Sequence, residues 1–325
     1  MLLQLHMPEE HTTDTSYSQF IDVVIPAYNA RDVIRKSASS SLLQELPENW
    51  RKNVIIVDDG SSDNTAQYCQ EIFDEQVKVI AHKQNLGRSS CRNTGWRAGF
   101  GRYVIFLDAD CEWLATGSLH AHLKTLEAGA DVSTGSIVSC DPGFWGTYQN
   151  NLQSAREKVF SAGNLAAFTS ANFAIRRSVL EASGGFDEDY RYYGFEDRDF
   201  LLRLISLGAK ISFCPEAAII HNPDLSLRNV CGKIMESGRY SSTRFQNDHP
   251  AYYAGTSYGK IDCRLHGVPF TTLAIISEPM IPFLALLGDK MIDKSCIPFR
   301  FKQIYVKMIS GLAYMAGTYH ALKNI

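Results

Sequence analysis

Two carboxylates one residue apart, Asp108 and Asp110, directly follow the apolar run YVIFL. Such a run predicts a buried strand, and ligands of open parallel sheets bind at the carboxyl ends of strands. Neighbouring carboxylates repel each other, and a hard divalent cation, Mn²⁺ or Mg²⁺, would relieve this repulsion and hold phosphate oxygens. His221 ends another apolar run, AAII, and could add a neutral imidazole ligand. The alternative is an acidic surface turn and a structural histidine, because D-x-D is short and common.

Two earlier apolar runs also end in residues that suit a nucleotide. Asp58 and Asp59 follow NVIIV, and carboxylates there can accept hydrogen bonds from a base or a ribose. Pro26 and Tyr28 follow FIDVVI. Proline cannot donate to a central ladder, so Pro26 predicts the end of the strand, and Tyr28 could stack on a base. On these residues alone, ordinary strand–helix loops explain both segments as well.

Two predicted helix starts carry charge. Gly87, Arg88 and Arg92 lie at the first, and a helix N-terminus with guanidinium groups suits a diphosphate. Glu196 and Asp197 lie at the second, where a carboxylate is stabilised as the anion and could act as a general base toward a hydroxyl. Surface arginines and helix-capping acids are the plain alternatives.

The elements that must position these residues follow a regular order. In the first half, strands are predicted at 20–30, 53–65 with its loop, 77–82 and 101–113, and helices at 31–44, 64–74 and 87–100. In the second half, strands are predicted at 130–140 and 209–222, and helices at 147–160, 225–246 and 299–323. Buried runs that alternate with helices predict an α/β fold with a mainly parallel central sheet flanked by helices.

The order of the motifs is more specific than any one of them. P-A-Y-N, V-D-D-G-S, N-L-G-R-x-x-x-R-N, F-L-D-A-D and G-F-E-D follow one another between residues 20 and 245. In this combination the chain resembles the family-2 glycosyltransferases of the GT-A fold. The resemblance implies a Rossmann-like sheet and an inverting enzyme that moves a sugar from a nucleoside diphosphate, most often UDP, to a hydroxyl of a glycan or lipid-linked acceptor.

The resemblance also implies a role for each motif residue. On the donor side it assigns the surroundings of the uracil to Pro26, Tyr28, Asp58 and Asp59, the nucleotide loop and helix to Gly87, Arg88 and Arg92, and the ribose to Asp108. Asp59 is preferred over Asp58 as the partner of the base N–H. Asp110 and His221 would be ligands of Mn²⁺ or Mg²⁺.

On the acceptor side the resemblance makes Asp197 the general base and Glu196 a carboxylate that binds sugar or acceptor. The chemistry needs both sides, because the hydroxyl must lose a proton while the diphosphate leaving group gains negative charge. The Q-x-x-R-W element of processive synthases is missing, so we expect a non-processive enzyme that adds one sugar.

The motifs divide the chain into a flexible tail at 1–19, a catalytic domain at 20–246 and a helical extension at 247–325. Within the catalytic domain we expect a nucleotide-binding half at 20–112 and an acceptor-binding half at 113–246. The extension combines a proline-broken apolar segment with a basic amphipathic stretch. Through 267–323 it could contact an anionic membrane peripherally, pack on the catalytic domain, or form a homodimer interface.

Composition excludes several other classes. The 325 residues are 45% hydrophobic and 21% charged with a net charge of −3, which is typical of a globular protein and argues against nucleic-acid binding. No basic leader segment and no run of 18 uninterrupted apolar residues is present, and the eight cysteines are scattered, so we expect a cytoplasmic protein with reduced thiols.

Three alternative functions agree less well with the motifs. A sugar-nucleotide pyrophosphorylase would need a glycine-rich phosphate loop after the first strand, where this chain has PAYNARD. A nicotinamide enzyme would need G-x-G-x-x-G there. A catalytically inactive nucleotide-binding or membrane-surface scaffold of the same fold is the main alternative, and the intact acidic motifs argue against it.

Overall fold

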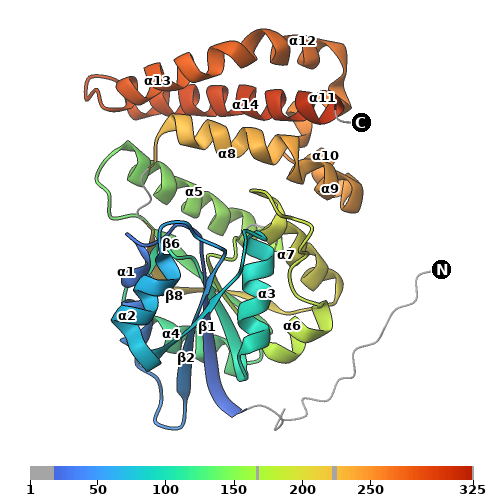
Figure 1. Ribbon diagram of the computed structural model, residues 1–325. Helices are drawn as coiled ribbons and strands as arrows, with labels where there is room; N and C mark the ends of the chain where they lie inside the picture. The colour runs from blue at the N-terminus through green and yellow to red at the C-terminus, as the bar shows by residue number, and fades with distance from the viewer. Residues whose placement is uncertain (1–17, 166–167, 222–224, 324–325) are drawn as a thin grey trace, which may run out of the picture.

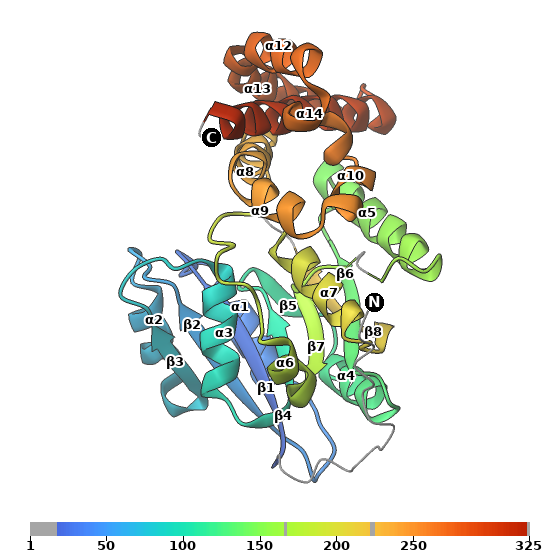
Figure 2. The ribbon, with the colours of Figure 1, turned by 90° about the vertical axis from the view of Figure 1, so that its right-hand side faces the viewer.

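The computed structural model describes residues 18–165, 168–221 and 225–323. Figures 1 and 2 show an α/β unit built around one twisted sheet and, beside it, a layer of C-terminal helices. The tail predicted at 1–19 lies outside the described residues as far as residue 17. The first strand, β1, begins at Ser18.

The sheet has eight strands in the order β3-β2-β1-β4-β7-β6-β8-β5. Their bounds are β1 Ser18–Ala27, β2 Arg51–Asp58, β3 Val77–Ala81, β4 Gly101–Leu107, β5 Cys111–Trp113, β6 Val132–Val138, β7 Asn172–Arg176 and β8 Ile211–His221. The first four strands are parallel, and so are β6 and β8. β7 is antiparallel to β4 and β6, and β5 to β8. The predicted α/β fold is confirmed, with parallel pairing throughout the first half and mixed pairing in the second.

Helices cover both faces of the sheet, which explains why its central strands read as continuous apolar runs. In the α/β unit they are α1 Ile34–Leu42, α2 Thr65–Phe73, α3 Arg88–Ala98, α4 Ser118–Glu127, α5 Phe144–Ser161, α6 Arg177–Ser183 and α7 Glu196–Ser206. In β1, Ile21, Val23 and Ile25 face a core shared with α1, α2 and α4. Val24 faces the opposite core, shared with α6 and α7.

Three predicted elements differ in detail. The strand predicted at 101–113 is two strands, β4 and β5, separated by the turn that carries the two aspartates. The helix predicted at 225–246 breaks at Tyr240 into two helices. β1 continues past Pro26 to Ala27, because its ladder with β4 ends at Val24 and only β2 pairs with it from there on.

The C-terminal layer is entirely helical. Its elements are α8 Leu227–Arg239, α9 Ser241–Asp248, α10 Pro250–Gly255, α11 Cys263–His266, α12 Val268–Ser277, α13 Ile281–Ile292 and α14 Phe299–Lys323. α14 lies along α8, α12 packs on α14, and α13 contacts both α8 and α14 (Figure 1). α8 and α14 touch at Gly238, where an added Cβ would lie 2.7 Å from the carbonyl oxygen of Tyr314. Packing thus groups α8 with the helical layer, although the sequence division assigned it to the catalytic domain.

Candidate active site

The carboxyl ends of β1, β2, β4 and β8 meet at one edge of the sheet, which is the edge where α/β proteins bind ligands. Asp58 ends β2 and His221 ends β8, while Asp108 directly follows β4. The first turns of α3 and α7 start at the same edge and carry the predicted arginines and the Glu196–Asp197 pair. The topology therefore brings the predicted site residues to one region.

Arg92 is the point at which three carboxylates meet. Its side chain is only 1% exposed, and Nη2 donates to Oδ1 of Asp108 at 3.0 Å. Nη1 lies 3.5 Å from Oδ1 of Asp197 and 3.9 Å from Oε1 of Glu196. The ring centroid of Phe186 lies 5.2 Å from the guanidinium carbon. The D-A-D and E-D motifs thus share one buried cation. Arg92 was predicted to lie beside the diphosphate, and the structure shows that it also pairs with these carboxylates.

Asp58 and Asp59 are buried and hold the neighbouring loops. Oδ2 of Asp59 accepts from the backbone N–H of Gly87, and its Oδ1 accepts from Leu86, both at 2.8 Å. Nδ1 of His82 lies 2.9 Å from the same Oδ1. Asp58 accepts from the backbone N–H of Ser61 at 3.2 Å and from its hydroxyl. Both carboxylates are already partnered, so the preference for Asp59 as the partner of the base stays a prediction.

The other predicted donor residues border these loops. Tyr28 follows β1 and is 53% exposed, so its ring has a free face, whereas Pro26 is buried in β1. Gly87 has φ +94°, and an added Cβ would lie 2.9 Å from the carbonyl oxygen of Arg191, so the position requires glycine. Arg88 begins α3 with its guanidinium carbon 5.3 Å from the ring centroid of Tyr193.

Asp110 and His221 approach each other where β5 pairs with β8. Nε2 of His221 lies 3.2 Å from Oδ2 of Asp110, and both side chains are partly exposed. Burial opposes ionisation of Asp110, but the hydrogen bond and charge of His221 lower its pKa below the usual value. The adjacent Cys111 stays protonated, because burial and then Asp108 raise the pKa of its thiol. One carboxylate and one imidazole, open to solvent, fit Mn²⁺ or Mg²⁺ with positions left for phosphate oxygens.

Glu196 and Asp197 differ in accessibility. The Asp197 side chain is 22% exposed, and its Oδ1 accepts a hydrogen bond from the hydroxyl of Ser170. The Glu196 side chain is 6% exposed and faces the guanidinium of Arg92. A general base must reach the acceptor hydroxyl, so Asp197, the more exposed of the two, stays the predicted base.

Glu196 should make folding stability depend on pH. Burial, and then the charge of Asp197, raise the pKa of Glu196 from the usual 4.5 to about 7. Between pH 4.5 and about 7 the folded protein binds this proton more tightly than the unfolded chain does. The stability therefore falls as the pH rises through this range and does not change further above it. We expect Glu196→Gln to stabilise the protein by up to about 3 kcal/mol at pH well above 7, and hardly at all near pH 4.5.

Urea unfolding of both proteins across this pH range measures the difference. Glu75→Gln, which changes an exposed glutamate after α2, is the matched control and should leave the pH profile nearly unchanged. Parallel profiles for the wild type and Glu196→Gln would contradict the raised pKa.

Three residues at the site were not singled out by sequence reasoning. Ser170 donates to Asp197, and His82 lies beside Asp59. Tyr193 lies between two cations, with its ring centroid 5.3 Å from Arg88 and 5.7 Å from Nζ of Lys233 in α8. Only Tyr193 had a signal, the aromatic loop before E-D, because the other two act through contacts with distant segments.

Two further arginines lie on the side of the site predicted to bind the acceptor. Arg156 comes from α5 and Arg198 from α7. Burial, and then the charge of Arg198, lower the pKa of Arg156, whereas Asp197 opposes that shift. Among the residues that the structure describes, neither guanidinium forms an ion pair. These cations are therefore available to an anionic group beside Asp197.

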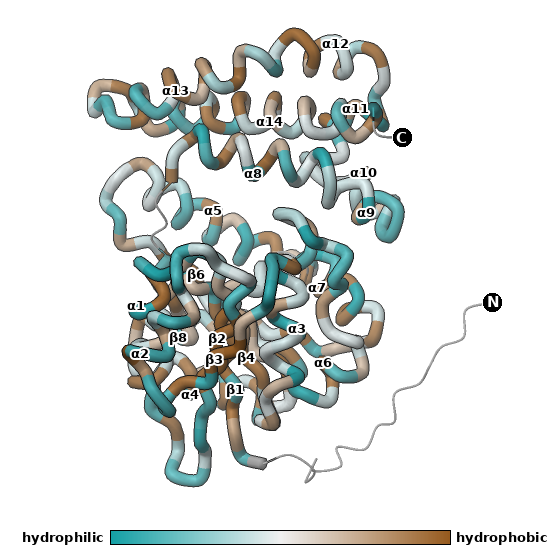
Figure 3. The backbone as a smooth tube through the Cα atoms, viewed as in Figure 1, coloured by the Kyte–Doolittle hydropathy of each residue, from teal (hydrophilic) through white to brown (hydrophobic). Residues whose placement is uncertain are grey.

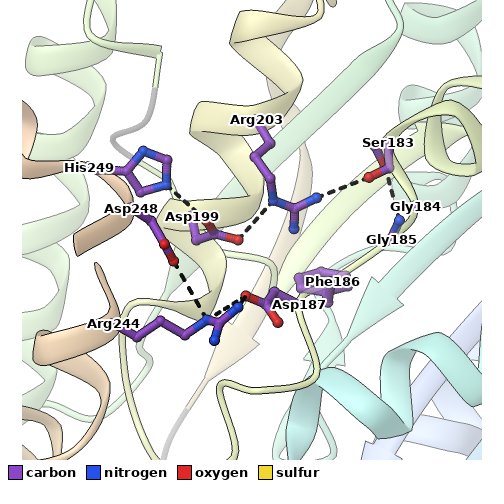
Figure 4. A pocket seen from close by; sticks show the side chains of 10 residues that line it. All are labelled: Ser183, Gly184, Gly185, Phe186, Asp187, Asp199, Arg203, Arg244, Asp248 and His249. Carbon is purple, nitrogen blue, oxygen red and sulfur yellow. Dashed lines mark hydrogen bonds and ion pairs between the residues drawn. The ribbon is translucent and has the colours of Figure 1, made fainter. Parts of the chain in front are cut away.

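A separate pocket lies where α6, α7 and α9 meet, and it contains none of the predicted site residues (Figure 4). Asp199 of α7 accepts from Nε2 of His249 at 2.8 Å and from Nε of Arg203 at 2.9 Å. Arg244 of α9 pairs with Asp187 at 2.6 Å. The charged side chains that line this pocket are paired with one another. The pair of His249 with Asp199 links the helical layer to α7, the helix that carries Glu196 and Asp197.

Comparison with known sequences identifies relatives of the chain. A sequence model described as "Glycosyl transferase family 2" matches residues 22–184, and one described as "N-terminal domain of galactosyltransferase" matches residues 151–223. The UDP-Glc:α-D-GlcNAc-diphosphoundecaprenol β-1,3-glucosyltransferase WfgD of Escherichia coli is 35% identical over 95 residues, 29% of this chain and 36% of the relative. The enzyme of the same description named WfaP, also from Escherichia coli, is 26% identical over 195 residues, 59% of this chain and 72% of the relative. Most of the curated relatives are matched over less than two thirds of their own length.

Comparison with solved structures supports the same fold. The mannosyltransferase PcManGT from Pyrobaculum calidifontis, solved in complex with GDP-Man and Mn²⁺, aligns with a TM-score of 0.58 at 20% identity, covering 96% of this chain and 90% of that chain. The likeness shows a shared GT-A fold. The family model covers half of the chain, and the order of the motifs and the site at the carboxyl ends of the strands agree with it. The chain therefore belongs to glycosyl transferase family 2.

Proposed function

We propose that the protein is a metal-dependent, inverting glycosyltransferase that moves one sugar from a nucleoside-diphosphate sugar to an acceptor hydroxyl. The observation that carries this proposal is Arg92, which joins Asp108 of the donor-side motif to Glu196 and Asp197 of the acceptor-side motif. Donor and acceptor would therefore meet across a single buried cation. This arrangement suits transfer between two substrates bound side by side.

On the donor side, the loops held by Asp58 and Asp59 would bind the base, with the open ring of Tyr28 stacked on it. Asp110 and His221 would hold Mn²⁺ or Mg²⁺, and such an ion, when bound, supplies positive charge that stabilises a diphosphate leaving group. UDP is the first choice of nucleotide, because WfgD and WfaP are named as enzymes that use UDP-Glc as their donor. The GDP-Man in PcManGT makes GDP the alternative to test.

On the acceptor side, Asp197 would take the proton of the attacking hydroxyl. The hydroxyl oxygen then forms a bond to the anomeric carbon while the bond from that carbon to the diphosphate oxygen breaks. A single displacement of this kind inverts the anomeric configuration. Ser170 positions Asp197 through its hydrogen bond, and ionised Glu196 beside it would strengthen its basicity.

The acceptor is proposed to be a lipid-linked glycan in polysaccharide or glycoconjugate biosynthesis. WfgD and WfaP are named for an acceptor that is a sugar on diphosphoundecaprenol. Arg156 and Arg198 would suit the phosphates of such an acceptor, since the two guanidiniums repel each other and an added anion would relieve that repulsion. The enzyme would then work at the cytoplasmic face of a membrane, in contact with it through 267–323.

Stabilisation by nucleotides tests the donor site directly. We expect UDP with Mn²⁺ at about a hundred times its dissociation constant to stabilise the folded protein by about 2.7 kcal/mol, and EDTA to remove most of this effect. Asp110→Asn should weaken UDP–Mn²⁺ binding at least about tenfold, because it removes the proposed ligand charge. The matched control is Glu112→Gln, which changes a partly exposed acid on the same strand pair.

Each other outcome has a definite meaning. A shift with GDP alone would change the donor to a GDP-sugar. A shift that EDTA leaves intact would remove the metal from the proposal. The absence of any shift in folded protein, with UDP and GDP both tested, would refute the donor site. Binding without sugar transfer or UDP-sugar hydrolysis would favour the inactive scaffold.

A further inference from the structure

The helical layer carries many hydrophobic residues in α12 and α13, the helices farthest from the sheet (Figure 3), and large apolar side chains there are exposed. Its large apolar side chains, between 43% and 78% exposed, are Val268, Leu273, Ile275 and Ile276 of α12, Met280 in the turn before α13, Phe283, Leu286 and Leu287 of α13, and Phe301, Ile304 and Met308 of α14. We call these residues the outer apolar face. Monomeric soluble proteins rarely expose so many neighbouring large apolar side chains, so this face requires an occupant.

The inner side of the same helices is packed against protein. Ala274, Ile281, Ala285 and Ile292 are buried among α8, α11 and α14. The hydroxyl of Tyr305 in α14 donates to the carbonyl oxygen of Leu284 at 2.8 Å. The segment Val268–Ile292 is long and apolar enough to span a bilayer, with a mean hydropathy of 1.7, but it lies lengthwise on α14. This placement fits a helix pair lying in the plane of a bilayer surface, not one crossing it.

The charge beside the outer apolar face points to an anionic occupant. Four exposed cations, Lys290, Lys294, Arg300 and Lys307, border it. The acids there are the exposed Asp293 and the partly exposed Glu278, which pairs with His320, so the local formal charge is +2. The whole chain carries −3, so positive charge is concentrated here. The nearby Asp289 points inward and accepts from the backbone N–H of Leu227. Two copies of this face brought together would repel each other, whereas anionic headgroups would be attracted.

We propose that the outer apolar face and its four cations dock the protein in the plane of an anionic lipid bilayer. This inference rests on the proposed function in one respect, because a lipid-linked acceptor must be met at a membrane. It specifies what that function leaves open: the surface used, the in-plane mode of binding and the preference for anionic lipid. The apolar side chains enter the headgroup region while the lysines and Arg300 contact phosphates.

Vesicle sedimentation with the full chain tests the proposal. We expect binding to phosphatidylcholine vesicles that contain phosphatidylglycerol and little binding to phosphatidylcholine alone. Replacing Lys290, Lys294, Arg300 and Lys307 by Gln should weaken binding at least about a hundredfold, and Phe283→Glu with Leu287→Glu at least about tenfold. The matched controls change exposed residues of the α/β unit: Arg35, Lys36, Lys124 and Lys210 to Gln, and Leu43→Glu with Leu114→Glu.

Other results would overturn the proposal. Bound protein that resists an alkaline carbonate wash would be inserted, not docked in the plane. A stable dimer that Phe283→Glu and Leu287→Glu convert to a monomer, with no vesicle binding by either, would assign the face to a second copy. The docking variants should keep wild-type activity on a water-soluble acceptor. Their activity there separates a failure of docking from a failure of the proposed function, which would abolish transfer in the wild type too.

Discussion

Asp197→Asn is expected to lower the turnover of sugar transfer about 10²- to 10⁴-fold while leaving donor binding nearly unchanged. The amide cannot take the proton of the acceptor hydroxyl, and it keeps the size of the side chain that accepts from Ser170. Asp197 lies on the acceptor side of Arg92, away from the proposed metal ligands Asp110 and His221. Steady-state kinetics with a UDP-sugar, together with stabilisation by UDP and Mn²⁺, would measure the two effects separately.

Two further variants make this result specific. Ser170→Ala removes only the hydrogen bond that orients Asp197 and should cost turnover about tenfold or less, with the fold intact. Glu196→Gln should keep substantial activity, because Glu196 is buried against Arg92 and reaches little solvent. If Asp197→Asn kept most of the wild-type turnover while Glu196→Gln lost it, the base would be Glu196.

The edge of the sheet was predictable because strand ends leave clear signals. Apolar runs such as the one from Val54 to Val57 predict strands covered on both faces, and polar residues follow each run. Parallel strands place their carboxyl ends together, so Asp58 and Asp108 had to lie near one another. The reversal at β7, which makes the sheet mixed, had no comparable signal, because a short apolar strand reads the same in either direction.

The contacts that shape the site were not predictable in the same way. Arg92 was expected beside a phosphate, and its meeting with three carboxylates depends on where α7 begins relative to α3. At the break between α8 and α9, the hydroxyl of Ser241 is shared between the carbonyl oxygens of Tyr192 and Tyr193, a contact with a distant segment that no local pattern predicts. The amphipathic stretch at 299–323 correctly predicted α14, but its main partner, α8, ends about sixty residues earlier in the sequence, so local spacing could not identify it.

Arg92→Gln is expected to destabilise the folded protein by about 3 to 5 kcal/mol near pH 8. The side chain is 1% exposed, so its loss would remove the buried countercharge of Asp108, Glu196 and Asp197 and leave the exposed Arg88 as the cation that acts on all three. Glutamine supplies no positive charge and cannot relieve the repulsion among the three. Urea unfolding at pH 8 would measure the loss. Arg97→Gln, on the same helix with a 53% exposed side chain, is the matched control and should cost less than about 1 kcal/mol.

The destabilisation should shrink as the pH falls, and this dependence separates a charge effect from a packing defect. Arg92 lowers the pKa of Glu196 against the larger effects of burial and Asp197, so without Arg92 that pKa should rise above its wild-type value of about 7. Glu196 is then protonated near pH 5 in the variant, and protonation removes one of the three charges that Arg92 compensates in the wild type. A cavity left by a shorter side chain would cost the same at both pH values. Equal losses at pH 5 and pH 8 would therefore contradict the role of Arg92 as the cation that holds the donor and acceptor motifs together.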